Sequence, residues 1–332
     1  MRRPILTGTA LLVFAANVIS VGRVAAAGKP PKLSVIRVKS SLDGSMQPSM
    51  FWAPESAETK STPLFVYLHS WSGDYRQKNT KWFAEAAKRG WIILHPDFRG
   101  RNDHPEACGS KLARRDILDA VDYVIARYKV DASRIYLAGT SGGGHMAMLM
   151  AGHHPRRFSA VSAWVGISDL AEWYRFHTRN GKPGRYAKMI AASLGGPPGK
   201  SKSIAAAYKD RSPIFHLHRV GDLPIEICAG VKDGKTGSVP IHHSLRAFNA
   251  IAEAGKHPTV SQRVINELWK TGSLTRPKSS DAVKDAAYGR AVILRRRAGA
   301  ARITLFDGGH EGLPKAAIHW LSRHTRATVR TP

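Results

Sequence analysis

The chain has 332 residues, of which 43% are apolar, so it is long and apolar enough for one large core and is not disordered throughout. Its formal charge is +27, and a positive field of this size attracts anions. The sequence contains no nucleic-acid-binding module, so nucleic acid is not the expected partner.

The first element along the chain is a predicted export signal. Arg2 and Arg3 precede the apolar run 5–21, and small residues follow up to Ala27. This order is typical of a secretory signal peptide cleaved near Ala27, while a membrane anchor is the alternative and Sec and Tat export both stay open. We therefore expect a secreted or periplasmic protein without a transmembrane anchor. Its mature charge is +24, because residues 1–27 carry three arginines and no acid.

After the signal, short apolar runs alternate with amphipathic stretches. Antiparallel edge strands are expected within 33–52. Buried strands are predicted where β-branched and aromatic residues run together, at 63–69, 91–97, 134–140, 158–166, 224–231 and 301–309. Helices are predicted where apolar residues recur at helical spacing, at 77–89, 114–128, 142–152 and 312–324. This alternation predicts an α/β fold with a mostly parallel twisted sheet and helices on both faces.

Two stretches interrupt the alternation within a predicted single domain, 28–332. Residues 168–223 combine aromatic residues with Gly, Pro, Lys and Arg, and we expect them to form a cap insertion over a site. Residues 256–292 read as a second insertion with one short helix and a polar loop. For the dense basic run 293–302, a solvated hairpin is the alternative to a role in binding anions.

A glycine-rich turn marks the candidate nucleophile. Gly139-Thr140-Ser141-Gly142-Gly143 has the pattern G-x-S-x-G and lies between a predicted strand and a predicted helix. Such a turn presents a serine oxygen clear of the backbone, and its glycines let the strand and the helix approach closely. A phosphate-binding loop requires G-x-x-x-x-G-K-[ST] or G-x-G-x-x-G followed by an acid, and neither is present.

A serine nucleophile requires a base and an orienting carboxylate, which in a sheet of this kind follow the serine in the order acid, then histidine. Asp233 follows the predicted strand 224–231, and His310 follows the predicted strand 301–309. Both residues should therefore reach the same edge of the sheet as Ser141. His145 lies on the helix after the serine and Asp222 precedes its strand, so both are worse placed.

Two backbone N–H groups are needed to bind the oxyanion that forms during attack. The first candidate is Gly142, at the start of the helix after the serine. The second comes from the loop after strand 63–69, with Trp71 preferred and Ser70 second. Trp71, Trp173 and Tyr174 are also predicted to contact substrate, and a core position is the alternative for Trp71.

The two cysteines, Cys108 and Cys228, could pair in an exported protein, but Cys228 lies in a predicted buried strand, which favours two separate thiols. No cluster of cysteine and histidine has the spacing of metal ligands, so neither a metal nor another cofactor is expected.

With these residues in place, the chain resembles the α/β-hydrolase superfamily, and within it the catalytic domain of the prolyl oligopeptidase (S9) family of serine peptidases. The resemblance covers about 60–325 and rests on GTSGGG at 139–144, on the Asp233 segment with its Val239-Pro240 step, and on GGHEG at 308–312. It implies Ser141 as nucleophile, Asp233 as acid and His310 as base. The residues before 60 are too few for the family's β-propeller, and H-S-W replaces the usual H-G-G of the oxyanion loop.

The sequence therefore predicts an exported serine hydrolase that cleaves an ester or a short peptide bond through an acyl-enzyme. Compact secreted relatives include carbohydrate esterases, so a small-molecule, saccharide-ester or peptide substrate is implied. The alternatives are an acyltransferase and a catalytically inactive binding protein on the same scaffold. The positive charge also suggests an acidic polysaccharide or an anionic surface as partner, against the alternative of a basic composition that serves no partner.

Overall fold

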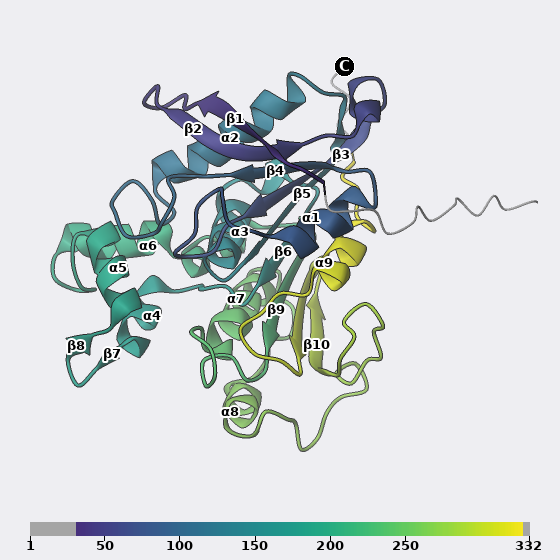
Figure 1. The fold of residues 1–332 in the computed structure, drawn as a ribbon. Helices are drawn as coiled ribbons and strands as arrows, with labels where there is room; N and C mark the ends of the chain where they lie inside the picture. The colour runs from purple at the N-terminus through teal and green to yellow at the C-terminus, as the bar shows by residue number, and fades with distance from the viewer. Residues whose placement is uncertain (1–30, 328–332) are drawn as a thin grey trace, which may run out of the picture.

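A computed structural model describes residues 31–327, so the predicted signal at 1–27 lies outside the described residues. Within residues 31–327 the chain forms a nine-stranded sheet in the order β1-β2-β4-β3-β5-β6-β9-β11-β10 (Figure 1). The strands of this sheet are β1 (Ser34–Lys39), β2 (Met46–Trp52), β3 (Thr62–Leu68), β4 (Ile92–Pro96), β5 (Val130–Thr140), β6 (Ala160–Trp164), β9 (Ile225–Gly230), β10 (Val292–Ala298) and β11 (Ala301–Phe306). Across this described range we find no helix with the length and apolarity to cross a bilayer.

The centre of the sheet is parallel and its edges are antiparallel. Strands β4, β3, β5, β6, β9 and β11 pair in parallel, whereas β1 and β2 at one edge and β10 at the other pair antiparallel. The predicted mostly parallel sheet with antiparallel strands within 33–52 is thus confirmed. In a parallel sheet all carboxyl ends lie at one edge, so the loops after β5, β9 and β11 meet there.

Helices cover both faces of the sheet, as the sequence predicted. Helices α1 and α9 pack against each other over one face, and α2, α3 and α7 cover the other (Figure 1). The helices are α1 (Thr80–Ala87), α2 (Lys111–Ile125), α3 (Gly142–His153), α4 (Leu170–Phe176), α5 (Arg185–Leu194), α6 (Lys202–Arg211), α7 (Ile241–Ala254), α8 (Gln262–Thr271) and α9 (Pro314–Leu321). Short 3₁₀ turns lie at Glu55–Glu58, Pro155–Arg157, Pro213–Phe215 and Leu217–Arg219.

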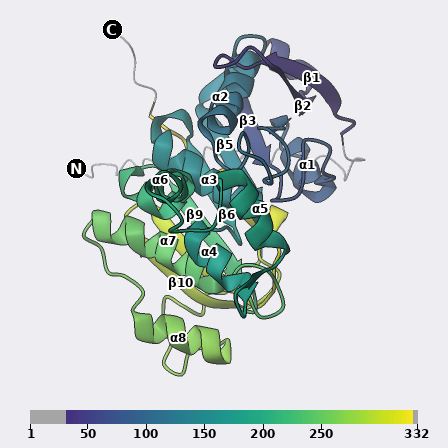
Figure 2. The same cartoon turned by 90° about the vertical axis from the view of Figure 1, so that its left-hand side faces the viewer.

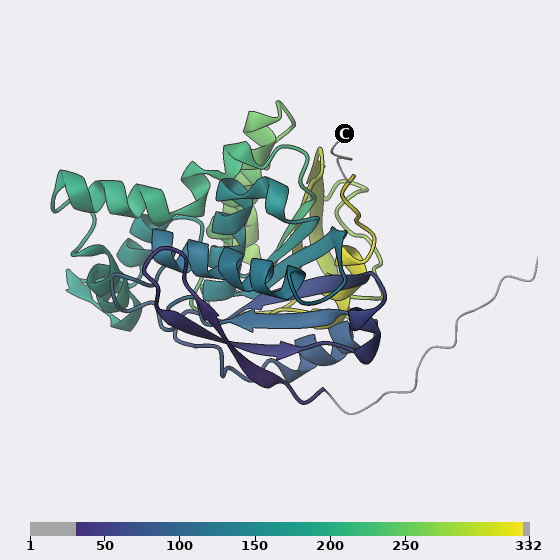
Figure 3. The ribbon, with the colours of Figure 1, turned by 90° about the horizontal axis from the view of Figure 1, so that it is seen from above.

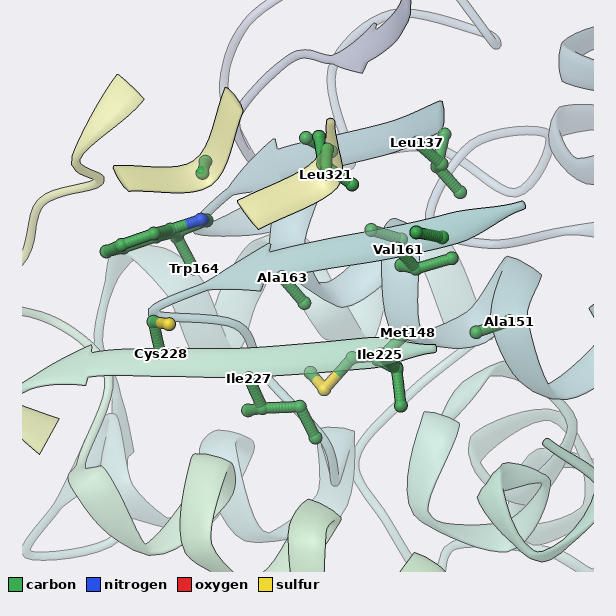
Figure 4. Close-up of a cluster of buried hydrophobic side chains, with 14 of the residues drawn as sticks. Leu137, Met148, Ala151, Val161, Ala163, Trp164, Ile225, Ile227, Cys228 and Leu321 are labelled. Carbon is green, nitrogen blue, oxygen red and sulfur yellow. The ribbon is translucent and has the colours of Figure 1, made fainter. Parts of the chain in front are cut away.

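The core fills the space between the sheet and these helices. Leu137, Val161 and Ile227 come from the neighbouring strands β5, β6 and β9, and they are fully buried with Met148 of α3 and Leu321 of α9 (Figure 4). Strands buried on both faces explain the continuous apolar runs in the sequence, since each side chain meets a helix on its own side.

Some element boundaries differ from the sequence prediction for local reasons. Helix α2 begins at Lys111 and not at residue 114, because the Ser110 side chain accepts a hydrogen bond from the Ala113 N–H and caps the helix there. Strand β5 extends back to Val130, which pairs with Thr62 of β3. Hydrophobic periodicity alone did not reveal the Ser110 cap or the pairing of Val130 with Thr62.

The segment between β6 and β9 lies beyond one end of the sheet. It contains α4, the short β7–β8 pair (Thr178–Arg179 and Lys182–Pro183), α5 and α6. Figure 2 looks onto these helices, and Figure 3 shows them extending past the sheet. We call residues 168–223 the cap. They bury a second, smaller apolar cluster together with Trp71 and Cys108.

The basic run 293–302 is a hairpin, as the alternative for this run had it, but it is only partly solvated. Strands β10 and β11 pair antiparallel across it, and Arg302 forms an ion pair with the fully buried Glu226. Arg295 and Arg296 pair with Asp285 and Asp281. The hairpin can pack inward because acids from other segments neutralise these arginines.

Both cysteines are buried and unpaired, which confirms the prediction of two separate thiols. Burial raises the pKa of the Cys108 thiol to about 12. The Cys228 sulfur lies in β9, 3.3 Å from the Tyr288 hydroxyl. Neither thiol is therefore a candidate nucleophile in its thiolate form.

The buried His95 makes stability depend on pH. Its Nδ1–H donates to the Tyr67 carbonyl at 2.6 Å, while Nε2 lies 3.3 Å from the Asn79 amide nitrogen, and burial lowers its pKa to about 3. Between pH 6.5 and 3 the unfolded chain therefore binds a proton at this residue that the folded protein does not bind. We expect His95 to lower the free energy of unfolding by about 1.4 kcal/mol per pH unit as pH falls through this window.

Urea unfolding from pH 7 to pH 5 measures this dependence. The variant His95→Gln should show a shallower pH slope, by about one proton, whereas His218→Gln at an exposed position should keep the wild-type slope. Identical slopes in all three proteins would contradict the assignment.

Candidate active site

Ser141 lies at the sharp turn between β5 and α3. Its backbone has φ 62° and ψ −117°, a strained conformation for a residue with a side chain. A Cβ on Gly143 would lie 2.1 Å from the Leu68 carbonyl oxygen, so only glycine fits where α3 meets the end of β3. The sequence predicted that these glycines allow the helix and the strand to approach closely, and the structure confirms this.

The structure brings Ser141, Asp233 and His310 together, although up to 169 positions separate them. The His310 Nε2 atom lies 2.9 Å from Ser141 Oγ, and its Nδ1 atom lies 2.8 Å from Asp233 Oδ2. Asp233 follows β9 and is fully buried, while His310 follows β11 and is partly exposed.

The second oxygen of Asp233 fixes the carboxylate in place. Its Oδ1 accepts hydrogen bonds from the N–H groups of Gly234 at 2.8 Å and Val239 at 3.2 Å. With Oδ1 held by the backbone, Oδ2 is left to accept from His310 Nδ1–H. This leaves the lone pair of Nε2 facing the Ser141 hydroxyl, which is the arrangement needed for a general base.

The two preferred oxyanion donors, Gly142 and Trp71, lie next to each other at the turn that carries Ser141. Gly142 is the first residue of α3, where helix N–H groups have no intrahelical acceptor. A Cβ on Gly142 would lie 2.2 Å from the Trp71 nitrogen, so the two backbones are in direct contact. Within residues 31–327 the Trp71 N–H has no acceptor, whereas the Ser70 N–H already donates to Gln77 Oε1 at 2.8 Å. The structure therefore favours Gly142 and Trp71 over Ser70 as oxyanion donors.

Trp71, Trp173 and Tyr174, which were predicted to contact substrate, are only 2%, 0% and 8% exposed. This burial favours a core position for them, and their contact with substrate stays a prediction. The Trp71 and Trp173 rings meet edge-on at 4.7 Å between centroids, in the apolar cluster beneath the cap. Large apolar rings gain most from being removed from water, and here the cap supplies a core for them.

More accessible aromatic side chains lie nearby on the cap. Phe176 is 36% exposed, and the half-buried His177 and Tyr186 rings have centroids 4.9 Å apart. The exposed Arg185 lies over the Tyr186 ring at 5.9 Å. These residues form a candidate substrate wall that the sequence did not single out.

The cap contacts both loops that build the site. Trp173 Nε1 of α4 and Nε2 of His177, the residue that follows α4, donate to the Ser238 carbonyl at 2.8 and 2.9 Å, in the loop after Asp233. From α5, an Arg185 nitrogen lies 3.5 Å from the Ser72 hydroxyl, in the loop that carries Trp71. No local pattern in the sequence predicts these contacts, because they join segments that are 60 to 115 residues apart.

The two rival residues lie elsewhere. His145 is fully buried, with Nε2 donating to the Arg211 carbonyl at 2.8 Å, and burial lowers its pKa to about 4. Asp222 is exposed and precedes β9. Within residues 31–327 neither side chain hydrogen-bonds Ser141; His145 reaches Ser141 only through its backbone N–H, which donates to the Ser141 carbonyl at 2.9 Å.

One cluster could supply metal ligands. His153, Asp210 and His216 offer ligand atoms within 4.8 Å of one another, at the end of α3 opposite Ser141. However, Arg114 already pairs with the Asp210 carboxylate at 3.2 Å. This guanidinium places a positive charge beside the three ligands and opposes a cation there. That no metal takes part stays a prediction.

Comparison with known proteins gives the family. The model of the Prolyl oligopeptidase family matches residues 74–267, which is more than half of the chain and includes Ser141 and Asp233. The chain belongs to this family. The resemblance inferred from the sequence motifs is thereby confirmed.

Individual relatives match this chain over only part of its length and at low sequence identity. Feruloyl esterase B of Neurospora crassa is 33% identical over 129 residues, 35% of this chain and 43% of that protein. Acylamino-acid-releasing enzyme 1 of Oryza sativa subsp. japonica is 25% identical over 215 residues, 60% of this chain and 26% of that protein. The matched part thus spans less than half the length of either relative.

A solved structure confirms the fold class. The acylaminoacyl peptidase of Pyrococcus horikoshii superposes with a TM-score of 0.59 and 18% identity, over 87% of this chain and 40% of that one. The predicted α/β-hydrolase architecture, a mostly parallel sheet with helices on both faces, is the one that this family shares.

Strain at Ser141 predicts an unusual order of stabilities. Glycine tolerates the Ser141 backbone conformation that strains other residues by about 1–3 kcal/mol. We therefore expect Ser141→Gly to unfold at a higher temperature than Ser141→Ala. At Ser203, on the exposed face of helix α6, the same pair of substitutions should show the opposite order, because glycine weakens a helix. Thermal unfolding of the four variants measures both orders, and equal stability at position 141 would show that the turn is unstrained.

Proposed function

We propose that the protein is a serine hydrolase that works through an acyl-enzyme on Ser141. The observation that supports this most directly is the continuous line of hydrogen bonds from Ser141 Oγ through His310 to Asp233. Family membership supports the same class of reaction.

Acylation uses each part of this line. Ser141 Oγ attacks the carbonyl carbon, and its proton passes to His310 Nε2. The Gly142 and Trp71 N–H groups bind the oxyanion, and Asp233 stabilises the imidazolium that forms. Nε2 then returns the proton to the departing alcohol or amine, which leaves the acyl group on Ser141. Water repeats the sequence, releases the acid and restores the Ser141 hydroxyl.

The substrate is an ester or a short peptide bond. The names of the similar proteins include an esterase and enzymes that release acylated amino acids, so both bond types are represented among them. In this chain the wall formed by Phe176, His177 and Tyr186, with Arg185 beside it, suits a substrate with a flat apolar group and an anionic group.

Activity-based labelling tests this proposal. A fluorophosphonate probe should label the full chain at Ser141, and hydrolysis of acetyl esters, feruloyl esters and prolyl peptides should then separate an esterase from a peptidase. An added alcohol acceptor should not divert the acyl group from water if the enzyme is a hydrolase and not an acyltransferase. A folded protein that resists the probe and cleaves none of these substrates would instead be an inactive binding protein.

We also propose that the protein is exported and that its positive charge serves an anionic partner such as an acidic polysaccharide. Export is supported by the sequence pattern of residues 1–27. The partner is supported by the exposed Arg175, Arg179 and Lys182 on the cap, which have no ion-pair partner within residues 31–327. Cations gathered on the cap would attract anionic material to the protein.

Salt dependence tests the anionic partner. Retention on an acidic polysaccharide should fall steeply as salt rises above 0.1 M, where the Debye length is about 10 Å, while kcat on a small neutral ester should barely change. Changing Arg175, Arg179 and Lys182 together to Glu should reduce retention. The exposed residues Arg37, Lys60 and Arg263, changed together to Glu, give a control with the same change in net charge. Equal retention of both variants would show that the positive charge of the cap has no specific role in binding the polysaccharide.

A further inference from the structure

A second hydroxyl contacts the base. The Ser238 Oγ atom lies 3.3 Å from His310 Nε2, the same nitrogen that lies 2.9 Å from Ser141 Oγ. Nothing in the sequence pattern marks Ser238, which precedes the Val239-Pro240 step by one residue.

The backbone on either side of Ser238 is held firmly. Its carbonyl accepts the two hydrogen bonds from Trp173 and His177 of the cap. The next residue, Val239, is buried and donates its N–H to Asp233. On the other side, a Cβ at Gly237 would lie 2.2 Å from Asp233 Oδ1 and 2.6 Å from His310 Cβ, so the loop packs directly against the acid and the base. Ser238 is therefore placed by the cap and the acid loop together.

Only one of the two hydroxyls can donate fully to the base. With Nδ1–H donated to Asp233, neutral His310 has a single lone pair, on Nε2. In the free enzyme Ser141 is the closer donor. In the acyl-enzyme Ser141 Oγ carries the acyl group and has no proton, so Ser238 and the incoming water become the hydroxyl groups at Nε2.

We propose that Ser238 orients the water that cleaves the acyl-enzyme, an inference that rests on the proposed function. The water donates one hydrogen to His310 Nε2 and the other to Ser238 Oγ, which directs an oxygen lone pair at the acyl carbon. The water oxygen forms a bond to that carbon, and Nε2 takes the first proton. The bond from the carbon to Ser141 Oγ then breaks, and Nε2 returns the proton to Ser141, so the acid leaves and the resting enzyme is restored.

This role predicts a separation of the two half-reactions. Acylation uses the Ser141 hydroxyl itself and needs no water, so kcat/KM, which reports acylation, should change by less than about twofold in Ser238→Ala. Deacylation loses one orienting hydrogen bond, so kcat on an ester limited by this step should fall by about tenfold. KM should fall in parallel. Because alanine keeps the main-chain carbonyl that accepts hydrogen bonds from the cap, we expect the loop to keep its position.

The experiment follows p-nitrophenyl acetate hydrolysis by the full chain in rapid-mixing and steady-state assays. Ser238→Ala should show a p-nitrophenol burst close to one equivalent followed by a slow phase, and Ser238→Thr, which keeps a hydroxyl, should recover most of kcat. Thr236→Ala is the matched control, because it removes a hydroxyl that donates to the Lys232 carbonyl in the same loop. It should behave as wild type.

Three results would overturn the proposed role of Ser238. Unchanged kcat and burst in Ser238→Ala would overturn the role of Ser238 while leaving the acyl-enzyme intact. A parallel fall in kcat and kcat/KM would also overturn it, since this would show that Ser238 supports the base in both steps. A wild-type protein that neither hydrolyses the ester nor reacts with the fluorophosphonate probe would instead refute the proposed function, and the water-positioning role with it.

Discussion

Ser141→Ala is expected to lower kcat for ester hydrolysis by roughly six orders of magnitude, to the level left by substrate binding and the oxyanion donors alone. The reason is that the substitution removes the hydroxyl that lies 2.9 Å from His310 Nε2 and attacks the substrate, so no acyl-enzyme forms. Steady-state kinetics on an activated ester measure the loss, and the fluorophosphonate probe should no longer label the protein.

The fold of this variant should be intact, because Ser141 is anchored by its backbone. Its N–H donates to the Trp164 carbonyl at 2.8 Å, and its own carbonyl accepts from the His145 N–H at 2.9 Å. Thermal unfolding close to that of wild type is the control for this. Turnover near the wild-type rate in pure Ser141→Ala protein would rule out Ser141 as nucleophile.

Asp233→Asn should lower kcat by roughly four orders of magnitude, less than the loss of the serine. The Gly234 and Val239 N–H groups would hold the amide oxygen, which turns the amide NH₂ toward His310 Nδ1. Nδ1 must then accept, so the ring proton moves to Nε2 and the base loses the lone pair that receives the Ser141 proton. The kcat of this variant on the same ester measures the effect.

The exposed Asp222 provides the matched control, because it was the other candidate acid in the same part of the sequence. Asp222→Asn should keep wild-type kcat. If the two variants were equally active, a different group would have to orient His310.

The order of the candidate triad was predictable from the sequence because each member follows a strand of the parallel core. Continuous apolar runs identify such strands, and the carboxyl ends of parallel strands share one edge, so Ser141, Asp233 and His310 could be placed together without knowing a single contact. The glycines around Ser141 added the turn geometry, since only a helix packed tightly on a strand needs them.

Side-chain exposure was not predictable in the same way. Trp173 and Tyr174 occupy a segment rich in Gly, Lys and Arg, which reads as a surface, yet the cap closes a small core of its own around them. Likewise the choice between Ser70 and Trp71 depends on Gln77, whose side chain occupies the Ser70 N–H. These properties arise from packing between segments and have no local signature.

By itself the sequence determined the parallel core of the sheet, the order of those strands along the chain and the three residues that meet at its edge, because hydrophobic periodicity and turn residues are local properties. Only the tertiary structure decided which aromatic side chains are buried and which N–H groups are free. It also revealed that Ser238 lies beside the base. Those outcomes depend on which distant segment covers a residue, and the cap, folded back over the loops after β3 and β9, provides that cover here.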